Sequence, residues 1–330
     1  MPQPTASDVH VNIPLTNISV AYIQSAKNFI ADQVFPRVPV ERQSDSYLTY
    51  DRTYWFRDTA EERAPGTESA GDGYELSFNN QYYARVYSIH KDVDDQTRAN
   101  ALPPVDLDRD TTEWLTQKLL IRKELQWAGN FFGPGIWTGN LTGVASAPGA
   151  NQFTKWSVAG STPIEDIMGQ VIAITRLTGI KPNVLVLSPD VFNVLLNHAE
   201  IVDRIKYSQL GVTTEELLAA IFQIDKVLVA WAVTNTAQEQ APATQPQVGN
   251  YNFAMAGGAL LVYAAPGPSL MRPSGGYTFV WTGYMGAGAA GNRILSFRME
   301  WLRSERIEGE IAFDQHVVAP DLGVFFASAI

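Results

Sequence analysis

The sequence predicts an α+β fold, and three features of the chain support this prediction. Two stretches rich in aromatic and β-branched residues flank a turn-rich segment between residues 47 and 89, which indicates a β-hairpin. An unusually long helix-forming stretch follows at residues 106–132. Helix and strand patterns then alternate through the middle of the chain, and its end is strand-like.

The beginning of the chain predicts an arm followed by a short helix. Residues 1–20 are polar, contain proline and are expected to be extended. Over residues 21–34, apolar side chains recur at spacings of three and four, which is typical of an amphipathic helix. These side chains are Ile23, Ala26, Ile30 and Val34. Pro36 and Pro39 end the pattern, because proline lacks the N–H that a continuing helix needs.

The hairpin is predicted to have strands over residues 47–56 and 74–89, with a long tip between them. Its aromatic side chains fall on both faces, and an isolated two-stranded hairpin is only marginally stable in water. The hairpin must therefore either fold back on the core of its own chain or lie on a neighbouring molecule.

The tip of the hairpin is acidic. Residues 58–75 contain six acidic residues and one basic residue, which gives a local charge of −5. A solvated loop accounts for this charge, and so does a contact with basic residues of a partner. The charged residues are Asp58, Glu61, Glu62, Arg63, Glu68, Asp72 and Glu75.

The long helix has clear start and stop signals. Asp106 is the expected N-cap, and Asp108 and Asp110 lie close to the positive end of the helix dipole. A Gly-Pro-Gly sequence at residues 133–135 ends the helix. A helix of about 26 residues spans roughly 39 Å, which is long for a globular domain.

The rest of the chain predicts a loop and then alternating elements. Residues 133–160 are rich in glycine, alanine, serine and proline and are expected to form a loop. A capping box at residues 162–165 opens a helix that Gly179 closes. A helix is expected over residues 189–198, a second follows it and ends at residue 207, and a third is expected over 213–222. Strands are expected over 184–187, 226–233, 252–264, 277–284 and from 294 onward, and residues 234–250 form a low-complexity loop.

Composition excludes several classes of function. The 330 residues carry a net charge of −10 with a pI of about 4.9, so the basic footprint of a sequence-specific nucleic-acid binder is absent. The chain has no cysteine, which excludes disulfides and thiolate metal sites. Its histidines show no metal-ligand spacing, so we expect neither a metal nor a cofactor. They are His10, His90, His198 and His316.

No membrane partner is expected. The chain begins without the basic and apolar regions of a signal peptide. Its longest weakly polar run, residues 253–265, is too short and too rich in glycine to cross a bilayer. These features favour a soluble chain made in a cytoplasm.

One glycine motif is compatible with an enzyme. Residues 286–291 read G-A-G-A-A-G and match the G-x-G-x-x-G pattern of dinucleotide-binding loops. That chemistry needs a helix directly after the glycines, so that the helix N-terminus meets a pyrophosphate. The residues that follow alternate with period two, which indicates a strand. A flexible glycine loop therefore explains the motif better than a nucleotide site.

The order of these parts resembles the major capsid proteins of tailed bacteriophages, which have the Hong Kong 97-type fold. Four stretches have sequences similar to those of such coat proteins, and the resemblance covers nearly the whole chain. They are VFPRVPV at 34–40, residues 54–73 with APGTESAG at their centre, TRAN at 97–100 and IKPNVLVLSP at 180–189.

The resemblance implies a division of the chain. Residues 1–35 correspond to an N-terminal arm and residues 36–160 to the first part of a peripheral domain. That part includes an extended loop at 45–90 and a spine helix at 106–132. Residues 161–290 correspond to an axial domain and residues 291–330 to strands that return to the peripheral domain.

The resemblance also implies a function, which is non-enzymatic. The chain is expected to self-assemble as hexamers and pentamers into an icosahedral shell around double-stranded DNA, without sequence-specific DNA binding. Portal, scaffolding and possible decoration proteins are the expected partners. The protein would be located in the virion capsid after assembly in the host cytoplasm.

Two departures from the family pattern limit what is carried over. Some members crosslink a lysine of the extended loop to a neighbour, but no lysine lies between Lys27 and Lys91 here, so this isopeptide is not expected. Some members carry a long N-terminal scaffolding segment. This chain starts almost at once with the arm, so any scaffold is expected to be a separate protein.

The candidate inter-subunit contacts are charged residues. Glu61, Glu62, Glu68 and Asp72 at the hairpin tip are expected to meet bases on a neighbouring copy, and Arg63 among them is a further candidate contact. The candidate bases are Lys118, Arg122 and Lys123, or Arg293, Arg298, Arg303 and Arg306.

Two alternatives stay open. An encapsulin-type compartment shares the fold but encloses enzymes, and an interior groove for a cargo peptide would favour it. A nucleotide-binding α/β enzyme would use the glycine loop at residues 286–291 and would retain a nucleotide on purification.

Overall fold

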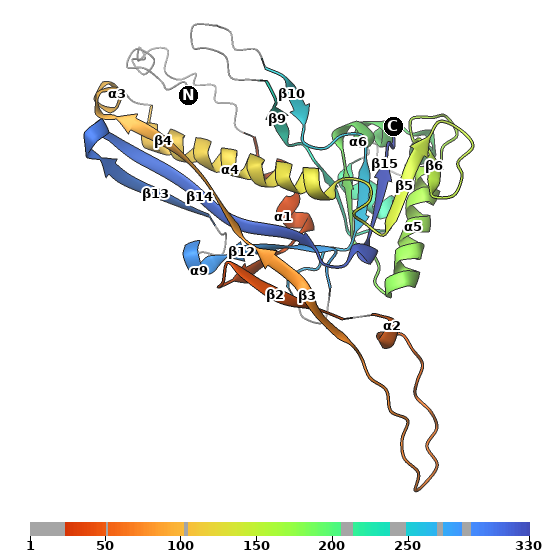
Figure 1. The fold of residues 1–330 in the computed structure, drawn as a ribbon. Helices are drawn as coiled ribbons and strands as arrows, with labels where there is room; N and C mark the ends of the chain where they lie inside the picture. Colours follow the sequence, from red (N-terminus) through yellow and green to blue (C-terminus); the bar gives the residue numbers. More distant parts are fainter. Residues whose placement is uncertain are drawn as a thin grey trace.

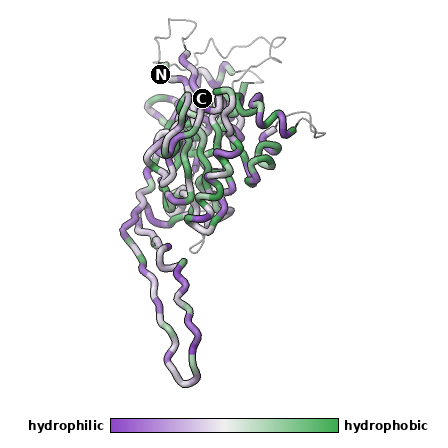
Figure 2. Tube along the Cα trace, turned by 90° about the vertical axis from the view of Figure 1, so that its right-hand side faces the viewer, coloured by the Kyte–Doolittle hydropathy of each residue, from purple (hydrophilic) through white to green (hydrophobic). Residues whose placement is uncertain are grey.

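A computed structural model describes residues 24–50, 52–101, 105–205, 214–237, 249–268, 273–285 and 292–330. Two sheets lie side by side, and a long helix runs from one to the other (Figure 1). A long loop projects away from both sheets (Figures 1 and 2).

The first sheet has five strands, and its central strand is the longest in the described residues. This strand, β14, pairs with β4 along one side and with β13 and then β12 along the other. β1 adds to β12 in parallel. The strands are β1 (Arg37–Val40), β4 (Arg85–Asp94), β12 (Gly276–Trp281), β13 (Asn292–Met299) and β14 (Ser304–Val317).

The predicted long helix is confirmed as α4 (Leu107–Phe131), which lies along this sheet. The Asp106 carboxylate accepts the N–H groups of Asp108 and Arg109, as expected of an N-cap. Leu115 and Leu119 of α4 are buried against apolar side chains of β4 and β14. Burial of one apolar stripe on the sheet fixes the helix in place.

The second sheet has six strands in the order β6-β5-β15-β11-β7-β8. They are β5 (Gly139–Val144), β6 (Gln152–Thr154), β7 (Val184–Leu187), β8 (Lys226–Val229), β11 (Ala259–Val262) and β15 (Gly323–Ala327). Four helices accompany this sheet, namely α5 (Pro163–Thr178), α6 (Pro189–Leu196), α7 (Ala199–Ile205) and α8 (Glu215–Ile221).

Successive side chains of β7 point to opposite faces of the second sheet, and each face packs against a separate hydrophobic core. Leu185 and Leu187 are buried with residues of α5 to α8, whereas Val184 and Val186 are buried on the opposite face. That opposite core includes Trp127 from the end of α4. The spine helix therefore packs on the five-stranded sheet at one end and on the six-stranded sheet at the other.

The projecting loop begins and ends in a two-stranded sheet. β2 (Ser44–Tyr50) pairs antiparallel with β3 (Leu76–Tyr83), and the short helix α2 (Arg52–Trp55) follows β2. The ring of Tyr47 lies 5.4 Å from that of Phe279 in the first sheet, and the ring of Tyr82 lies 4.6 Å from it. The base of the hairpin thus packs on its own chain, and the rest projects.

The remaining elements are short. β9 (Val233–Asn235) and β10 (Tyr251–Phe253) form a small antiparallel ribbon. The other helices are α1 (Ala31–Val34), α3 (Asp95–Asn100) and α9 (Thr282–Met285), with 3-10 turns η2 (Ala26–Asn28), η3 (Glu300–Leu302) and η4 (Pro320–Leu322).

The helix predicted over residues 21–34 is wrong in its described part. The backbone is extended at Phe29, with φ −96° and ψ 111°, and separates η2 from α1. The N–H groups of Ile30 and Ala31 donate to the Glu124 carboxylate of α4 instead of continuing a helix. A tertiary contact has replaced the local one. Residues 1–23 of the predicted arm lie outside the described residues.

The loop predicted over residues 133–160 is also wrong, because it contains β5 and β6. The glycines that suggest a loop are needed instead because β5 packs closely against the end of the chain. A Cβ on Gly139 would lie 2.4 Å from Val324, and one on Gly143 would lie 2.1 Å from the carbonyl oxygen of Ser328. Strand β5 can approach the end of the chain only without these side chains.

Several boundaries differ from the predicted ones. The strand predicted over 74–89 divides at Ala84 into β3 and β4, and the strand predicted over 47–56 stops at Tyr50. The strand predicted over 226–233 ends at Val229, that over 252–264 divides into β10 and β11, and that over 277–284 gives way to α9. Residues 206–213 and 238–248 of the predicted helices and loop lie outside the described residues.

The capping box predicted at residues 162–165 does not form, although the helix does. Thr162 accepts no capping hydrogen bond, and Glu200 at the start of α7 accepts the N–H of Ile164 at 3.2 Å. The predicted end is confirmed, because Gly179 has a left-handed φ of 69°.

Strand pairing crosses the domain boundaries that the resemblance implies, and those boundaries stay a prediction. β12 lies within residues 161–290 but belongs to the five-stranded sheet. β5 and β6, within 36–160, and β15, within 291–330, belong to the six-stranded sheet. Pairing between strands so distant in sequence leaves no local signal of the kind that periodicity provides.

Candidate functional site

The structure offers little support for a nucleotide site. Residues 286–291, which hold the glycine motif, lie outside the described residues. The element that follows them is strand β13 rather than a helix. No helix N-terminus therefore follows the motif to meet a pyrophosphate.

A serine and a histidine meet, but their hydrogen bonds are structural. Ser161 Oγ lies 3.0 Å from His198 Nε2, and the N–H of Glu200 donates to His198 Nδ1. Because Nδ1 accepts, the ring proton of the neutral histidine is on Nε2, and this nitrogen donates to the serine. A general base needs the opposite tautomer, so the pair ties α7 to the start of α5. Burial lowers the pKa of His198, which keeps the ring neutral.

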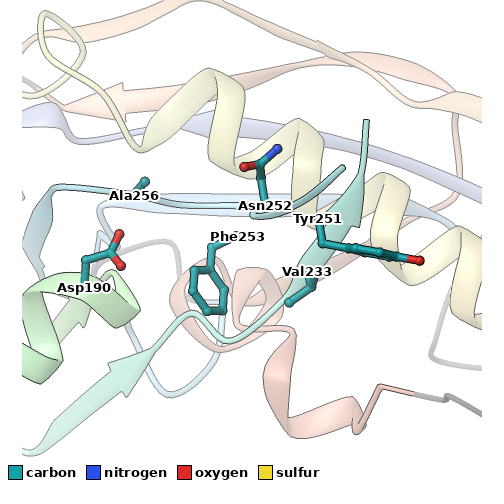
Figure 3. Close-up of a pocket in the computed structure, with 6 residues that line it drawn as sticks. All are labelled: Asp190, Val233, Tyr251, Asn252, Phe253 and Ala256. Atoms are coloured by element: carbon teal, nitrogen blue, oxygen red, sulfur yellow. The ribbon is translucent and has the colours of Figure 1, made fainter. Parts of the chain in front are cut away.

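A hollow of about 300 Å³ lies between α6 and the β9–β10 ribbon (Figure 3). Among the described residues that line it, Asp190 supplies the one carboxylate, and none is a histidine, lysine or arginine. Tyr251 at its edge is 71% exposed, so the hollow does not exclude water. Its lining residues are Asp190, Val233, Tyr251, Asn252, Phe253 and Ala256.

The described part of the chain offers neither a metal cluster nor a membrane-spanning helix. No group of three histidine or acidic side chains there could hold a metal ion. No described helix is long and apolar enough to cross a membrane.

The extended loop presents aromatic side chains to solvent. Trp55 and Tyr74 are 49% and 62% exposed, although they pack against each other and against Tyr50 at centroid distances of 5.7–6.0 Å. Phe78 on β3 is 61% exposed. Side chains of this size on a projecting ribbon indicate a surface that a partner covers.

The acidic tip, residues 58–75, lies at the far end of this loop and has no regular secondary structure (Figure 2). Its charged side chains, including Glu61, Glu62, Arg63 and Glu68, are exposed. Asp72 accepts hydrogen bonds from Thr59 and from its neighbour Gly73, which lower the pKa of its carboxyl. Within the described residues, none of these tip carboxylates forms an ion pair.

The root of the loop is fastened to the six-stranded half of the molecule. Arg52 of α2 forms an ion pair with Asp321 of η4. The ring of Phe56 lies against the end of α5, where a Cβ on Gly179 would be 3.4 Å away. The direction of the loop is therefore set by contacts with both halves.

Three of the candidate bases are already paired within the chain. Arg298 binds both carboxylate oxygens of Asp95 at 2.6 Å, and this contact raises the pKa of Arg298 and lowers that of Asp95. Arg306 binds both oxygens of Asp92 at 2.7 and 2.9 Å. Arg293 binds Glu310. Cross-strand pairing places Arg293 opposite Glu310 and Arg306 opposite Asp92, whereas Asp95 lies at the start of α3, directly after β4.

The other candidate bases differ in accessibility. Lys123 is 3% exposed and forms an ion pair with Asp32, so it is not a surface cation. Arg122 and Lys118 are exposed on α4, over the rings of Tyr87 and Trp114. Arg303 sits at the turn before β14 with a left-handed φ of 47°, and no ion pair engages it in the described residues.

A cluster of buried charges beneath the arm is absent from the sequence prediction. Glu124 is 1% exposed and accepts the N–H groups of Ile30 and Ala31, and neighbouring Lys123 binds Asp32. A Lys-Glu pair on the apolar face of an otherwise amphipathic helix was the available signal, since charges in such positions need partners.

Apolar side chains are also exposed where β13 forms an edge of the five-stranded sheet. Leu295 and Phe297 on β13 are partly exposed, and Trp301 in the turn after it is 76% exposed. Edge strands of monomeric proteins are normally protected by charges or proline. The two charges of this edge, Arg293 and Arg298, are paired within the chain, and the apolar side chains between them are compatible with contact to another molecule.

Two curated relatives carry the name major capsid protein. The relative from Pseudomonas phage JBD67 is 25% identical over 327 residues, 96% of each chain. The relative from Burkholderia phage BcepMu is 25% identical over 220 residues, 66% of this chain and 68% of the relative. No protein-family model matches the chain.

Solved structures share the fold over nearly the whole chain. A phage-related protein from Bordetella bronchiseptica RB50 is 18% identical, with a TM-score of 0.69 over 93% of this chain and 94% of that one. The capsid of Cyanophage P-SCSP1u has a TM-score of 0.59 at 10% identity, over 97% and 93%. An encapsulin complex from Synechococcus elongatus PCC 7942 has a TM-score of 0.55 at 9% identity, over 96% and 95%.

These comparisons confirm two of the predictions made from the sequence. The α+β fold is of the Hong Kong 97 type. The resemblance to phage major capsid proteins extends to relatives that match over as much as 96% of the chain.

Proposed function

We infer that this chain is the major capsid protein of a phage, a coat subunit whose copies assemble into an icosahedral shell. The observation that carries this conclusion is the full-length match to a phage major capsid protein on a chain with the Hong Kong 97-type fold. The relatives imply a structural, non-enzymatic role.

The geometry of the subunit fits this role. The extended loop and the β13 edge expose large apolar side chains that no other described residue covers. Identical copies carry identical surfaces, so contacts of one surface with a different surface on the next copy propagate into rings. We propose that these rings are the hexamers and pentamers of the shell.

We propose that the acidic tip meets exposed bases of a neighbouring copy. Arg122, Lys118 and Arg303 are the best candidates, because none of them forms an ion pair in the described residues. Arg298, Arg306 and Arg293 are already paired, and Lys123 is buried. A loop charge of −5 then favours one register of contact over others.

We further propose that the domains follow the two sheets. The peripheral domain contains the five-stranded sheet and most of α4, and the axial domain contains the six-stranded sheet with α5 to α8. On this division, β15 belongs to the axial domain and β12 to the peripheral one.

We propose double-stranded DNA as the content of the shell. A net charge of −10 opposes tight phosphate binding, which suits DNA that must be packed and later released. Portal, scaffolding and decoration proteins are the proposed partners, and assembly in the host cytoplasm is the proposed route to the virion.

Electron microscopy of the purified chain tests this function. Closed shells of uniform diameter are the expected result. The content of shells isolated from cells then separates the two shell proteins, because a phage coat encloses DNA whereas an encapsulin-type compartment encloses an enzyme. A nucleotide retained by a monomer would instead favour the enzyme alternative.

A further inference from the structure

The β9–β10 ribbon has one occupied side and one open side. On the β9 side, the side-chain amide of Gln24 donates from Nε2 to the carbonyl of Val233 at 2.7 Å, and its Oε1 accepts the N–H of Val233 at 2.9 Å. An amide that makes both bonds stands where the backbone of a further strand would pair. The other side of the ribbon is β10, and no second described strand pairs with it. β10 is therefore the side at which a strand can be added.

The hydrogen bonds of the ribbon show which backbone groups point outward from β10. Asn250 and Ala254 form backbone hydrogen bonds to the residues that flank β9. Because this orientation repeats at every second residue of an antiparallel pair, Asn252 also faces β9. The N–H and C=O groups of Tyr251 and Phe253 then point away from β9. An extended segment that joins a sheet edge pairs with groups of this kind.

The side chains of the same two residues line the hollow beside α6. Successive side chains of a strand point to opposite faces, and Figure 3 shows those of Asn252 and Phe253 on opposite sides of β10. Tyr251, Phe253 and Val233 share a face of the ribbon and line the hollow of about 300 Å³. This volume is at the small end of the range for ligand sites and suits a single long side chain. A side chain of an added strand on this face points into the hollow.

The chemistry of the hollow favours a cation. Asp190 supplies an exposed carboxylate that forms no ion pair among the described residues. Tyr251 and Phe253 are 71% and 38% exposed, so aromatic surface is available beside this carboxylate. A guanidinium binds a carboxylate through two N–H groups and also stacks on aromatic rings, which a compact ammonium does less well. The hollow therefore fits an arginine side chain.

We propose that β10 and this hollow form a docking site for an extended segment of a different protein, which adds as a strand to β10 and places an arginine against Asp190 and Tyr251. A second copy of this chain is a poor source of that segment, because surfaces of a chain with a net charge of −10 repel each other. Three arginines on its described strands, Arg293, Arg298 and Arg306, are also already paired. The site is separate from the loop tip and the β13 edge, which the proposed function assigns to contacts between copies.

A peptide titration of the full-length chain, at a concentration below that of assembly, tests the site. The probe is the peptide TVTRTVT, labelled with fluorescein and amidated, and fluorescence anisotropy measures its binding. Its sequence reads the same in both directions, so it fits a parallel or an antiparallel strand, with valine and arginine on one face. Replacement of the arginine by citrulline, which removes the charge, should weaken binding about fivefold. N-methylation of every peptide bond should abolish binding, because it removes the donors of the added strand.

Variants of the chain locate the bound peptide. Asp190→Asn and Tyr251→Ala should each weaken binding of TVTRTVT about fivefold. Glu215→Gln is the matched control, because Glu215 is likewise an exposed acidic residue in the first turn of a helix, and it should leave binding unchanged. Tyr251→Ala keeps the proposal testable if Asp190→Asn does not fold.

Four results overturn the proposal. They are no binding of TVTRTVT up to about 1 mM, equal weakening by Asp190→Asn and Glu215→Gln, unchanged affinity of the N-methylated peptide, and loss of shells in Asp190→Asn. The last result would mean that another copy, rather than a different protein, occupies the hollow. Peptide binding is measured on the unassembled subunit, so failure of the docking site and failure of the coat function are separate results.

Discussion

The guanidinium of Arg298 on β13 donates two hydrogen bonds of 2.6 Å to the carboxylate of Asp95 at the start of α3. This bidentate pair joins the outer strand of the five-stranded sheet to the segment after β4. It also neutralises, within one subunit, a base that the sequence offers as a contact for a neighbour. A contact with a neighbouring copy therefore depends on charged residues that have no such partner within the chain, among them the carboxylates of the hairpin tip.

Reversal of the tip charge should impair assembly and leave the subunit folded. Both Glu61 and Glu62 are exposed and make no ion pair in the described residues, so Glu61→Lys with Glu62→Lys removes no intramolecular contact. Shell yield, measured by sedimentation at physiological salt, should fall several-fold, while the circular dichroism spectrum and Tm stay unchanged. Glu113→Lys, also at an exposed position but on α4, is the control. Unchanged yield in the double variant would count against a charged contact at the tip.

The close approach of β5 to the end of the chain predicts a contrast between two glycines. A Cβ on Gly143 would meet the backbone of Ser328 at 2.1 Å, whereas a Cβ on Gly133 meets nothing within 4 Å. Gly143→Ala should therefore lower the free energy of unfolding by about 1–3 kcal/mol, the usual cost of overpacking. Gly133→Ala should change it by less than about 0.5 kcal/mol. Equal effects in urea denaturation would show that β5 does not pack this way.

Buried Glu124 predicts a specific pH dependence of global stability. Its pKa is about 7 in the folded chain and returns to an ordinary 4.5 on unfolding. The unfolded chain therefore releases this proton first as the pH rises, and stability falls between these values and is flat above them. The free energy of unfolding relative to Glu124→Gln should drop by about 2 kcal/mol from pH 5 to 7.5.

The comparison with Glu124→Gln isolates this group from others that titrate nearby. Burial lowers the pKa of His198, so its contribution is lost as the pH falls below its unfolded value, the opposite sign. This contribution is common to both chains and cancels in the difference. A difference that is constant with pH would contradict a strongly shifted Glu124.

The sequence predicts the local elements of this fold well and the long-range ones poorly. The cap at Asp106 and the apolar stripe with Leu115 are local signals, and α4 lies where they place it. β5 is not predicted, because the reason for its glycines is the close approach of Val324 and Ser328, which lie far along the chain. Interior packing, rather than loop flexibility, selects those glycines.

The candidate site shows the same division. That the tip is acidic and exposed follows from composition, and the structure agrees. Which bases are free does not follow, because Arg306 is neutralised by Asp92 across a strand pair that no local pattern predicts. The role of Glu124 is not predicted for a related reason, since its partners are the backbone N–H groups of Ile30 and Ala31.

The acidic balance of the chain predicts weak contact with DNA. With a net charge of −10, the free subunit should bind duplex DNA with a Kd above about 1 μM at physiological salt, and more weakly as salt is added. Fluorescence anisotropy with a labelled duplex measures both quantities. Nanomolar affinity would contradict an interior surface that releases its DNA.

Sedimentation velocity of the full-length chain over a range of concentrations tests the coat function most directly. The projecting loop and the open β13 edge predict a slow subunit fraction and a fast fraction of uniform, closed assemblies that grows with concentration. A single monomeric species at every concentration up to the millimolar range would contradict self-assembly as the purpose of these surfaces.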